Sequence, residues 1–395
     1  MTTPARVRVG ALAAAALVTT AGGLIAASNA AASTDVTASA ACGVLFDDFN
    51  YTSPSDSAFT GHGWTARDNP GGPGVPGATW SAANITFPTV DGQKVAQLQA
   101  ATDGTAAGTT HAEFLQTERR FFEGTYAARI KFSDAPVSGP DGDHINETFF
   151  AIGPGQRFDY DPLYSELDFS EYLPNGGWGV TGSINYQTSW NGYREDPWDP
   201  YNAHSQQTGS LAGWHTVMGQ VANGHVRYFI DGVQVGDHTV SEKDPAWSVY
   251  PRAAMSINFN LWFIDLAAHT GGRATYQEHV DWVYYAKNES VSPADLTART
   301  AAYRSSGRVH EDTLVGGGCP TGPTPTATSS PRPPTTPPPA TPPPASCAGA
   351  SPWAWGTVYP AGDRATHNGH LWQANWWTQG SEPGLTAQWR DLGTC

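Results

Sequence analysis

The chain has 395 residues, enough for one large domain and a smaller one. Only 14% of the residues are charged, while 15 Trp, 15 Tyr, 15 Phe, 43 Gly and 31 Pro favour strands and turns over helices. The formal net charge of −15 argues against nucleic acid or an anionic membrane as partner, because both attract basic patches.

Residues 1–41 are predicted to be a signal peptide and a short leader. Arg6 and Arg8 precede the apolar run GALAAAALVTTAGGLIAA (10–27), and small residues follow, as in secretory signals. A membrane helix is one alternative, but this run is rich in Ala, Gly and Thr. A lipoprotein cysteine at Cys42 is another, but Cys42 lies far beyond the run and lacks a leucine three places earlier. We therefore expect a secreted, extracellular protein.

Four cysteines in a secreted chain predict two disulfides, with three pairings to choose from. Cys42 and Cys319 bracket the large region, and Cys347 and Cys395 bracket the last 49 residues. We expect the pairs Cys42–Cys319 and Cys347–Cys395, because each bridge then ties the two ends of one domain. A zinc site made of cysteines is disfavoured, since no pair has C-x-x-C spacing.

The large region, 42–319, reads as short strands separated by turns. The clearest segment is VANGHVRYFIDGVQVG (221–236), in which Asn-Gly and Asp-Gly turns lie between alternating apolar residues. A helical period is found only near 293–305. The pattern predicts an all-β sandwich.

The segment SELDFSEYL (165–173) holds three acids, Glu166, Asp168 and Glu171. In a regular strand Glu166 and Asp168 share one face, and Glu171 points to the other. A solvated, merely decorated face is the alternative interpretation, because acidic clusters are commonly that.

Two details favour a shared face for all three acids. Leu167 and Phe169 occupy the alternate positions, so one face is buried. A β-bulge near Phe169–Ser170 would insert one extra residue and return Glu171 to the acidic side. Leaning inward, the carboxyls of Glu166 and Glu171 could then approach to about 5–5.5 Å, the separation for retaining glycoside hydrolysis.

Such chemistry needs one ionised glutamate to attack the anomeric carbon and one protonated glutamate to help the leaving oxygen depart. Asp168, between them, can hydrogen-bond one glutamate and raise the pKa of the other.

The stretch ELDFSE (166–171) resembles the E-x-D-x-x-E catalytic strand of glycoside hydrolase family 16, the laminarinase and lichenase type of endo-β-glucanase. The likeness covers roughly 120–290, with a weaker match at FDDFN (46–50). It is carried further by GTYAARIKF (124–132), GWHTVMGQ (213–220), VRYFIDGVQV (226–235), SINFNLWF (256–263) and VDWVYY (280–285).

This resemblance implies a concave β-jelly-roll sandwich of the concanavalin-like type, with an open cleft that suits internal cleavage of a polysaccharide. By position, Glu166 would be the nucleophile, Glu171 the acid/base and Asp168 the supporting carboxylate.

The resemblance also implies substrate contacts. SINYQT (183–188) is similar to the lichenase FNYYT, which places Asn185 and Tyr186 beside the scissile bond. Tyr164 stands where lichenases have a Trp before the first glutamate. The remaining expected contacts are Arg129, Trp190 in an aromatic-rich loop (190–204), and Trp262 of the N-L-W match.

The sequence departs from the family at HINETFFAIG (144–153), which offers Phe149 and Phe150 where many members have W-P-A-x-W. Some members bind a structural Ca²⁺ through an Asp in the last strand, and Asp281 matches that position. No cofactor is required, and a structural calcium ion at Asp281 is left open.

Residues 320–346 are Pro/Thr/Ser-rich and almost uncharged, which predicts a linker. As polyproline II at about 3.1 Å per residue it would reach on the order of 80 Å.

Residues 347–395 form a predicted small, disulfide-tied β module with six Trp, too many for its core to hide. The stretches VYPAGDRATHNGHLW (358–372), ANWWTQG (374–380) and QWRDLGTC (388–395) resemble carbohydrate-binding modules of families five and twelve, which bind chitin and sometimes cellulose. By position, Tyr359, Trp376 and Trp377 are the expected binding platform, while Trp372 and Trp389 belong in the core.

The leading prediction is a secreted, monomeric, retaining endo-β-glucanase that acts on β-1,3- or mixed β-1,3/1,4-glucan. Its small module would direct it to chitin-containing fungal cell walls. The alternatives are activity on another β-linked polymer, such as a galactan or a chitosan-like chain, and transglycosylation. The last alternative is a lectin-like binder without catalysis.

Overall fold

The computed structural model describes residues 43–314, 347, 349–354, 357, 359, 362–374, 383 and 389–395. The predicted signal peptide, the linker, the Cys42–Cys319 bridge and the platform residues Trp376 and Trp377 lie outside these residues. Within them, strands dominate, and no helix is long and apolar enough to span a membrane.

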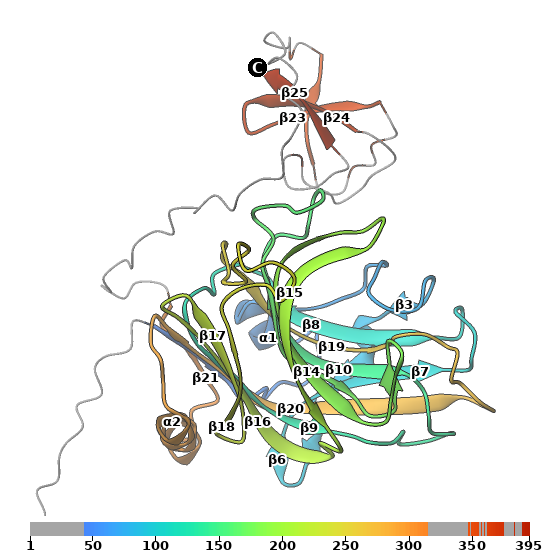
Figure 1. Cartoon of the computed structure of the whole chain (residues 1–395), viewed down its shortest axis with the longest axis vertical. Coiled ribbons are helices and arrows are strands. Elements are labelled where there is room, and N and C mark those ends of the chain that lie inside the picture. Colours follow the sequence, from blue (N-terminus) through green and yellow to red (C-terminus); the bar gives the residue numbers. More distant parts are fainter. Residues whose placement is uncertain are drawn as a thin grey trace, which may run out of the picture. The chain divides into compact units, whose positions relative to one another are not determined.

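The large domain is a sandwich of two antiparallel sheets (Figure 1), which confirms the predicted all-β jelly roll. In the first sheet, β20 pairs with β9 on one edge and with β7 and β1 on the other, and β16, β17 and β18 continue beyond β9. Its strands are β1 (Val44–Asp47), β4 (Ile85–Thr86), β7 (Ala96–Thr102), β9 (Gly124–Phe132), β16 (Gly213–Ala222), β17 (His225–Ile230), β18 (Val233–His238), β20 (Ala274–Lys287) and β21 (His310–Asp312).

The second sheet carries the segment of interest in its middle. Neighbouring strands are antiparallel throughout. In spatial order they are β2 (Trp64–Ala66), β8 (Thr110–Gln116), β19 (Ser256–Phe263), β10 (Ile145–Ile152), β11 (Glu166–Leu173), β14 (Ile184–Arg194) and β15 (Asp199–Thr208).

Short elements connect these strands. A parallel pairing of β3 with β8 and one residue pair between β7 and β8 join the two sheets at one edge. The connecting elements are α1 (Ser57–Gly61), β3 (Thr79–Trp80), η1 (Ala82–Asn84), β5 (Thr89–Val90), β6 (Gln93–Lys94), β12 (Gly176–Gly177), β13 (Val180–Thr181) and α2 (Pro293–Ser305).

The core lies between the two sheets, where alternate residues of both pack together. The first sheet contributes residues such as Tyr126 and Ile130, and the second contributes Leu167, Phe169 and Phe259, all fully buried. Because side chains alternate along each strand, the residues of the second sheet that do not face this core point outward.

The outer face of the first sheet is covered by α2, the helix predicted over 293–305. Ser292 caps it by accepting from the Asp295 backbone N–H, and Leu296 packs on Met218 and Trp282 of the sheet.

Two residues to which the family resemblance gave roles, Asp281 and Arg129, lie on this outer face. Asp281 is fully buried and accepts from Arg129 Nη1 at 2.6 Å and Arg304 Nη2 at 2.5 Å. Each carboxylate oxygen of Asp281 therefore pairs with a guanidinium group, and calcium binding there stays untested. Arg129 also stacks on Trp214 with its Cζ 4.4 Å from the ring, on the α2 side of the first sheet, so it cannot reach a sugar at Glu166.

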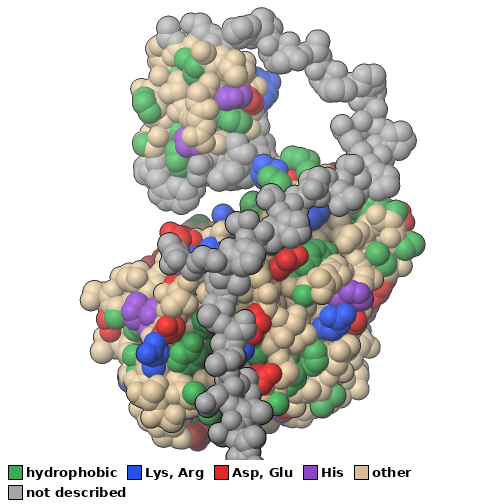
Figure 2. Space-filling view, turned by 90° about the vertical axis from the view of Figure 1, so that its left-hand side faces the viewer, with side chains coloured by type: hydrophobic (Ala, Val, Ile, Leu, Met, Phe, Trp, Pro, Cys, Tyr) green, Lys and Arg blue, Asp and Glu red, His purple; other side chains and the backbone are tan. Residues whose placement is uncertain are grey.

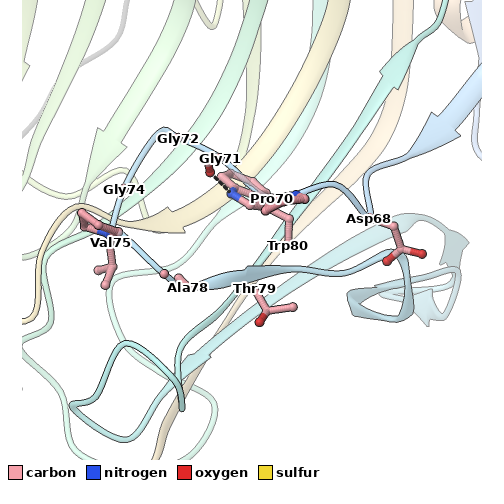
Figure 3. A pocket seen from close by; sticks show the side chains of 11 residues that line it. Asp68, Pro70, Gly71, Gly72, Gly74, Val75, Ala78, Thr79 and Trp80 are labelled. Carbon is pink, nitrogen blue, oxygen red and sulfur yellow. Dashed lines mark hydrogen bonds between the residues drawn. The ribbon is translucent and has the colours of Figure 1, made fainter. Parts of the chain in front are cut away.

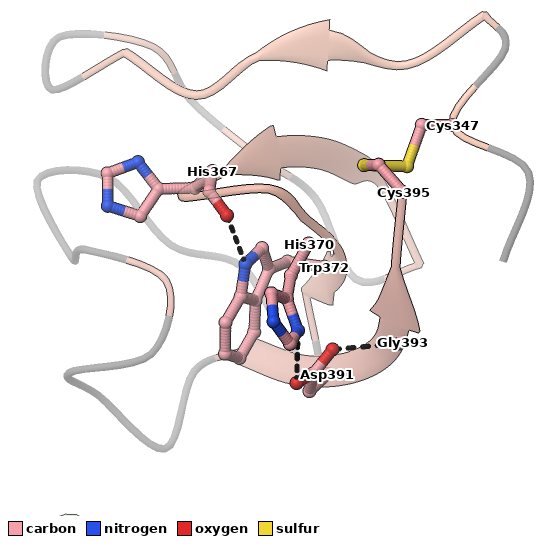
Figure 4. Close-up of a disulfide and its surroundings, with 7 residues drawn as sticks. All are labelled: Cys347, His367, His370, Trp372, Asp391, Gly393 and Cys395. Carbon is pink, nitrogen blue, oxygen red and sulfur yellow. Dashed lines mark hydrogen bonds and ion pairs between the residues drawn. A yellow bond between two sulfur atoms is a disulfide. The ribbon is translucent and has the colours of Figure 1, made fainter. Parts of the chain in front are cut away.

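The small module is a four-stranded sheet of β22 (Ser351–Pro352), β23 (Arg364–His367), β24 (His370–Ala374) and β25 (Trp389–Thr394). The predicted Cys347–Cys395 disulfide is confirmed and ties the first described residue of the module to the last (Figure 4). Trp389 lies in the core as predicted, and Trp372 packs against it.

Tyr359 is a correction in this module. It is only 6% exposed, its ring lies 4.8 Å from that of Trp389, and its hydroxyl accepts from the Ala354 backbone N–H. A ring held in this way is part of the core and offers no free face to a sugar.

Candidate active site

A β-bulge interrupts β11 at the predicted place. On the β10 side, Asp168 lies opposite Phe150 and Ser170 lies opposite the adjacent Phe149. One residue of β11, Phe169, is therefore extra. The β14 side shows the same break between Asp168 and Glu171. The predicted bulge is confirmed, and it returns Glu171 to the face of the other two acids.

The extra residue is held by the core. Phe169 is fully buried, stacked 5.0 Å from the ring of Tyr126 and tilted at 4.7 Å from Phe149. Gly219 on β16 makes room for it, since a Cβ there would lie 2.4 Å from Phe169 Cε1. The bulge thus depends on a glycine of the opposite sheet.

Each acid of β11 receives a hydrogen bond from a neighbouring side chain. The hydroxyl of Tyr164 donates to Glu166 Oε2, and Trp190 Nε1 donates to Asp168 Oδ2 at 3.0 Å. Asn146 Nδ2 donates to Glu171 Oε1 at 3.1 Å. The donors come from the segment before β11 and from β14 and β10, so three parts of the chain orient the carboxylates. We call this side of the second sheet the acidic face.

Burial and mutual repulsion make the acids weak. Burial raises the pKa of Glu171 to about 7, and the charge of Glu166 adds to this rise. Burial also raises the pKa of Glu166 to about 7, with Glu113 adding to it and the Tyr164 hydrogen bond opposing it. The pKa of Asp168 is raised by burial and then by Glu171 and Glu166. Near neutral pH the three acids therefore share protons, so an ionised and a protonated carboxyl can stand side by side.

Three of the six predicted substrate residues, Tyr186, Trp190 and Trp262, lie on the acidic face. Tyr186 is opposite Glu171 and Trp190 is opposite Glu166 across β11–β14, and opposite residues share a face. Trp262 is opposite Asn146, the residue that donates to Glu171.

Tyr164 has a different place from the one expected of a sugar contact. It is only 3% exposed, and its hydroxyl is engaged by Glu166. Its position suits holding the carboxylate of Glu166 rather than stacking on a ring.

Asn185 lies on the wrong side of β14. It is opposite Tyr172 of the core, is fully buried, and accepts from Ser170 Oγ at 2.7 Å. Its own amide donates to Gln207 Oε1 at 3.2 Å. The prediction of a sugar contact fails because Asn185 is adjacent in sequence to Tyr186 and so faces the opposite way.

Two residues of the site were missed from the sequence. Asn146 comes from the segment HINETFFAIG. Its alternation with Thr148 and Phe150 could have shown that these three side chains share one face of β10. Trp178 comes from the turn after β11 and is 51% exposed, with its ring 6.1 Å from that of Trp262 and 6.3 Å from that of Tyr186.

The backbone of Trp178 supports a role for it. Its φ is +51°, a left-handed conformation that costs free energy in any residue other than glycine. The chain places Trp178 in this conformation even though glycines, which adopt it more easily, precede and follow it. Held there, an exposed indole extends the acidic face beyond Tyr186 and Trp262.

A pocket of about 560 Å³ lies in the segment 68–80 (Figure 3). Trp80 Nε1 donates to the Gly71 carbonyl across it, and Asp68 is its one charged lining residue. It lacks the paired acid and base of β11, so we place the chemistry on the acidic face. On the surface in Figure 2, described acidic side chains (red) are spread widely and basic ones (blue) are scattered between them.

Comparisons with known proteins agree on two families. The model of Glycosyl hydrolases family 16 matches residues 78–284, and that of Carbohydrate-binding module family 5/12 matches residues 352–390.

Two curated proteins are similar to parts of the chain. Endo-1,3-1,4-beta-glycanase ExoK of Rhizobium meliloti (strain 1021) is 29% identical over 216 residues, which are 54% of this chain and 69% of that protein. Chitinase A of Pseudoalteromonas piscicida is 50% identical over 38 residues, 10% of this chain, and the chain spans only 5% of that relative.

Among solved structures, a family 16 endo-glucanase from Bacteroides ovatus aligns with a TM-score of 0.45 and 16% identity, over 60% of this chain and 98% of that one. A Bacillus licheniformis beta-glucanase aligns with a TM-score of 0.43 and 17% identity, over 62% and 98%.

The bulge predicts a sensitivity at Gly219. Gly219→Ala should lower the free energy of unfolding by about 1–3 kcal/mol, because its methyl group would overlap the ring of Phe169. Chemical denaturation of the full chain measures this. Gly61→Ala is the control, since a Cβ at Gly61 meets nothing within 4 Å. Equal stability of the two variants would contradict the account of the bulge.

Proposed function

The chain belongs to glycosyl hydrolase family 16, and from this premise we propose that it cleaves β-1,3- or mixed β-1,3/1,4-glucan inside the polymer with retention of anomeric configuration. The observation that carries this proposal is the bulged β11, which puts Glu166, Asp168 and Glu171 on one face with a donor to each. Membership of the family makes the chain a glycoside hydrolase, and the similarity to an endo-1,3-1,4-beta-glycanase supports β-glucan as its substrate.

In the first step Glu166 attacks the anomeric carbon and Glu171 gives its proton to the departing oxygen. The Tyr164 hydroxyl favours the ionised form of Glu166, because it donates to the charged oxygen. The charge on Glu166 in turn raises the pKa of Glu171 and keeps that acid protonated.

In the second step Glu171 takes a proton from water, and the water oxygen displaces Glu166 from the sugar. Once Glu166 is esterified its negative charge is gone, so the pKa of Glu171 falls and its role changes from acid to base. Asp168, held by Trp190, lies between the two and supplies the third carboxylate of the coupled set.

The aromatic side chains of the acidic face would hold the polymer. Tyr186 and Trp190 are part-exposed beside the acids, and the exposed Trp178 lies next to Trp262, which is itself largely buried. Planar rings stack on the C–H-lined faces of sugars with little loss of side-chain freedom.

The remaining parts of the proposal concern delivery. The match of residues 352–390 to a carbohydrate-binding module supports binding of an insoluble polysaccharide, with chitin as our choice. We propose secretion through residues 1–41 and a target in chitin-containing fungal walls, where the module raises the local substrate concentration.

Removing either glutamate should abolish hydrolysis. Glu166→Gln and Glu171→Gln should each lower kcat by about 10³-fold or more, because the nucleophile or the proton donor is lost. Mass spectrometry of products from laminarin, lichenan, agarose and chitosan measures this and identifies the polymer. NMR of the first-formed anomer tests retention.

The exposed Glu118→Gln is the matched control and should keep full activity. Undiminished hydrolysis by Glu166→Gln would refute the assignment, and binding without hydrolysis by the wild type would indicate a lectin.

The Tyr164 hydroxyl should set the acid limb of the pH profile. Tyr164→Phe removes a donor that lowers the pKa of Glu166. A hydrogen bond to a charged group contributes about 1.5–3 kcal/mol, so the acid limb of kcat/KM should move up by about 1–2 pH units. The deficit should be largest at low pH, where Glu166 is protonated, and should shrink as pH rises.

Tyr250→Phe is the control, because it loses a comparable hydroxyl bond to Glu123 away from the acidic face. An equal loss at every pH in Tyr164→Phe would indicate a purely structural role for this hydroxyl.

Trp178→Ala should raise KM for polymeric glucan about tenfold, equivalent to about 1.4 kcal/mol of lost stacking, with kcat changed little. Initial rates against glucan concentration give both constants. Trp214→Ala, on the outer face of the first sheet, should leave KM unchanged. The same KM in both variants would show that Trp178 does not bind the polymer.

The module residue Trp377 should govern adsorption and not catalysis. Trp377→Ala should weaken depletion of the protein by insoluble chitin about tenfold while hydrolysis of soluble glucan stays the same. If the wild-type protein adsorbs to cellulose and not to chitin, the ligand of the module is cellulose.

A further inference from the structure

A second cluster of chemically active side chains lies away from the acidic face. Asp47 ends β1, His62 follows α1, and His310 begins β21. Among the described residues these three form the one group of His, Cys, Asp and Glu whose ligand atoms all lie within 4.8 Å of one another. The chain brings them together from positions 263 residues apart.

The donor atoms converge on one carboxylate oxygen. His310 Nδ1 lies 3.1 Å and His62 Nδ1 3.9 Å from Asp47 Oδ2. Ligand bonds of a zinc ion are about 2.0–2.2 Å, so the donor atoms around a tetrahedral ion are about 3.3 Å apart. The two observed spacings bracket that value.

The two imidazoles are arranged as a pair. Their rings stack with centroids 3.5 Å apart and planes within 5° of parallel, so one ring has to turn before both Nδ1 lone pairs point at one ion.

Further donors orient the carboxylate of Asp47. The Phe49 backbone N–H donates to Oδ1 at 2.8 Å, and Trp64 Nε1 donates to Oδ2 at 2.9 Å. The Tyr51 hydroxyl also contacts Asp47 and lies 2.7 Å from His62 Nδ1. Such outer hydrogen bonds fix the direction of a metal-binding carboxylate.

The cluster is reachable from solvent. Asp47 is buried, but the side chains of His62 and His310 are 30% and 16% exposed. An ion can therefore approach from the histidine side, and a water molecule or the Tyr51 hydroxyl can complete its coordination.

We propose that Asp47, His62 and His310 bind a divalent transition-metal ion, with zinc the best match. Two imidazoles and one carboxylate suit zinc and its neighbours, whereas calcium and magnesium prefer sites made of oxygen atoms alone. Because β1 and β21 come from opposite ends of the domain, the ion joins these ends and stabilises the fold. Without the ion, the same atoms form a hydrogen-bonded network, so binding itself has to be measured.

The test uses the full chain without a histidine tag, freed of metal by a chelator. Isothermal titration with ZnCl₂ should show one zinc per chain, and zinc should raise the Tm. His62→Gln and His310→Gln should each weaken zinc binding at least tenfold. His225→Gln is the control, because His225 pairs with Asp237 at 2.7 Å but belongs to no metal-sized group of the described residues.

Cobalt gives a readout that needs no variant to fold. Co²⁺ added to the wild type should produce the visible absorption of a four-coordinate site, and zinc should displace it. Absence of both zinc binding and the cobalt bands in the folded wild type would overturn the proposal. Zinc binding that is equal in wild type, His62→Gln and His310→Gln would overturn it as well.

Discussion

The arrangement of the acidic face depends on one extra residue in β11. Phe169 is inserted into the core against Tyr126 and Phe149, in space that Gly219 leaves free. A strand without this insertion would turn Glu171 into the core, where an unpaired carboxyl is costly. Aromatic packing between the sheets thereby decides the chemistry on the outside of one of them.

Buried carboxylates have charged partners on the first sheet and neutral partners on the second. On the outer face of the first sheet, Asp281 is neutralised by Arg129 and Arg304 beneath α2, so this face is structural. On the acidic face, the described donors to Glu166, Asp168 and Glu171 are neutral: Tyr164, Trp190, Asn146 and, at 3.5 Å, Thr188. Neutral donors orient a carboxylate without pairing its charge, so burial still raises the pKa of both glutamates to about 7. The site is thus prepared for an acid and a base of similar strength.

Raised pKa values also carry a cost to the fold. A glutamate whose pKa is raised in the folded state favours folding below its unfolded pKa, and this contribution is lost as pH rises toward the folded value of about 7. The catalytic arrangement therefore opposes stability at neutral pH, and the aromatic core between the sheets has to offset it. A metal ion that joins β1 to β21 would act in the same direction as the core.

The sequence by itself determined what depends on near neighbours. Alternation of Leu167 and Phe169 with acids identified the strand and its bulge, the turn residues identified a β sandwich, and cysteine positions identified the Cys347–Cys395 bridge. Only the tertiary structure decided which partner each side chain meets. It turned Arg129 and Asp281 to the α2 side, buried Asn185 and Tyr359, and brought Trp178 beside Trp262 and His62 beside His310. The reason is physical: the face of a residue follows from its position along one strand, whereas its contacts follow from strands that are far away in the chain and adjacent in the sheet.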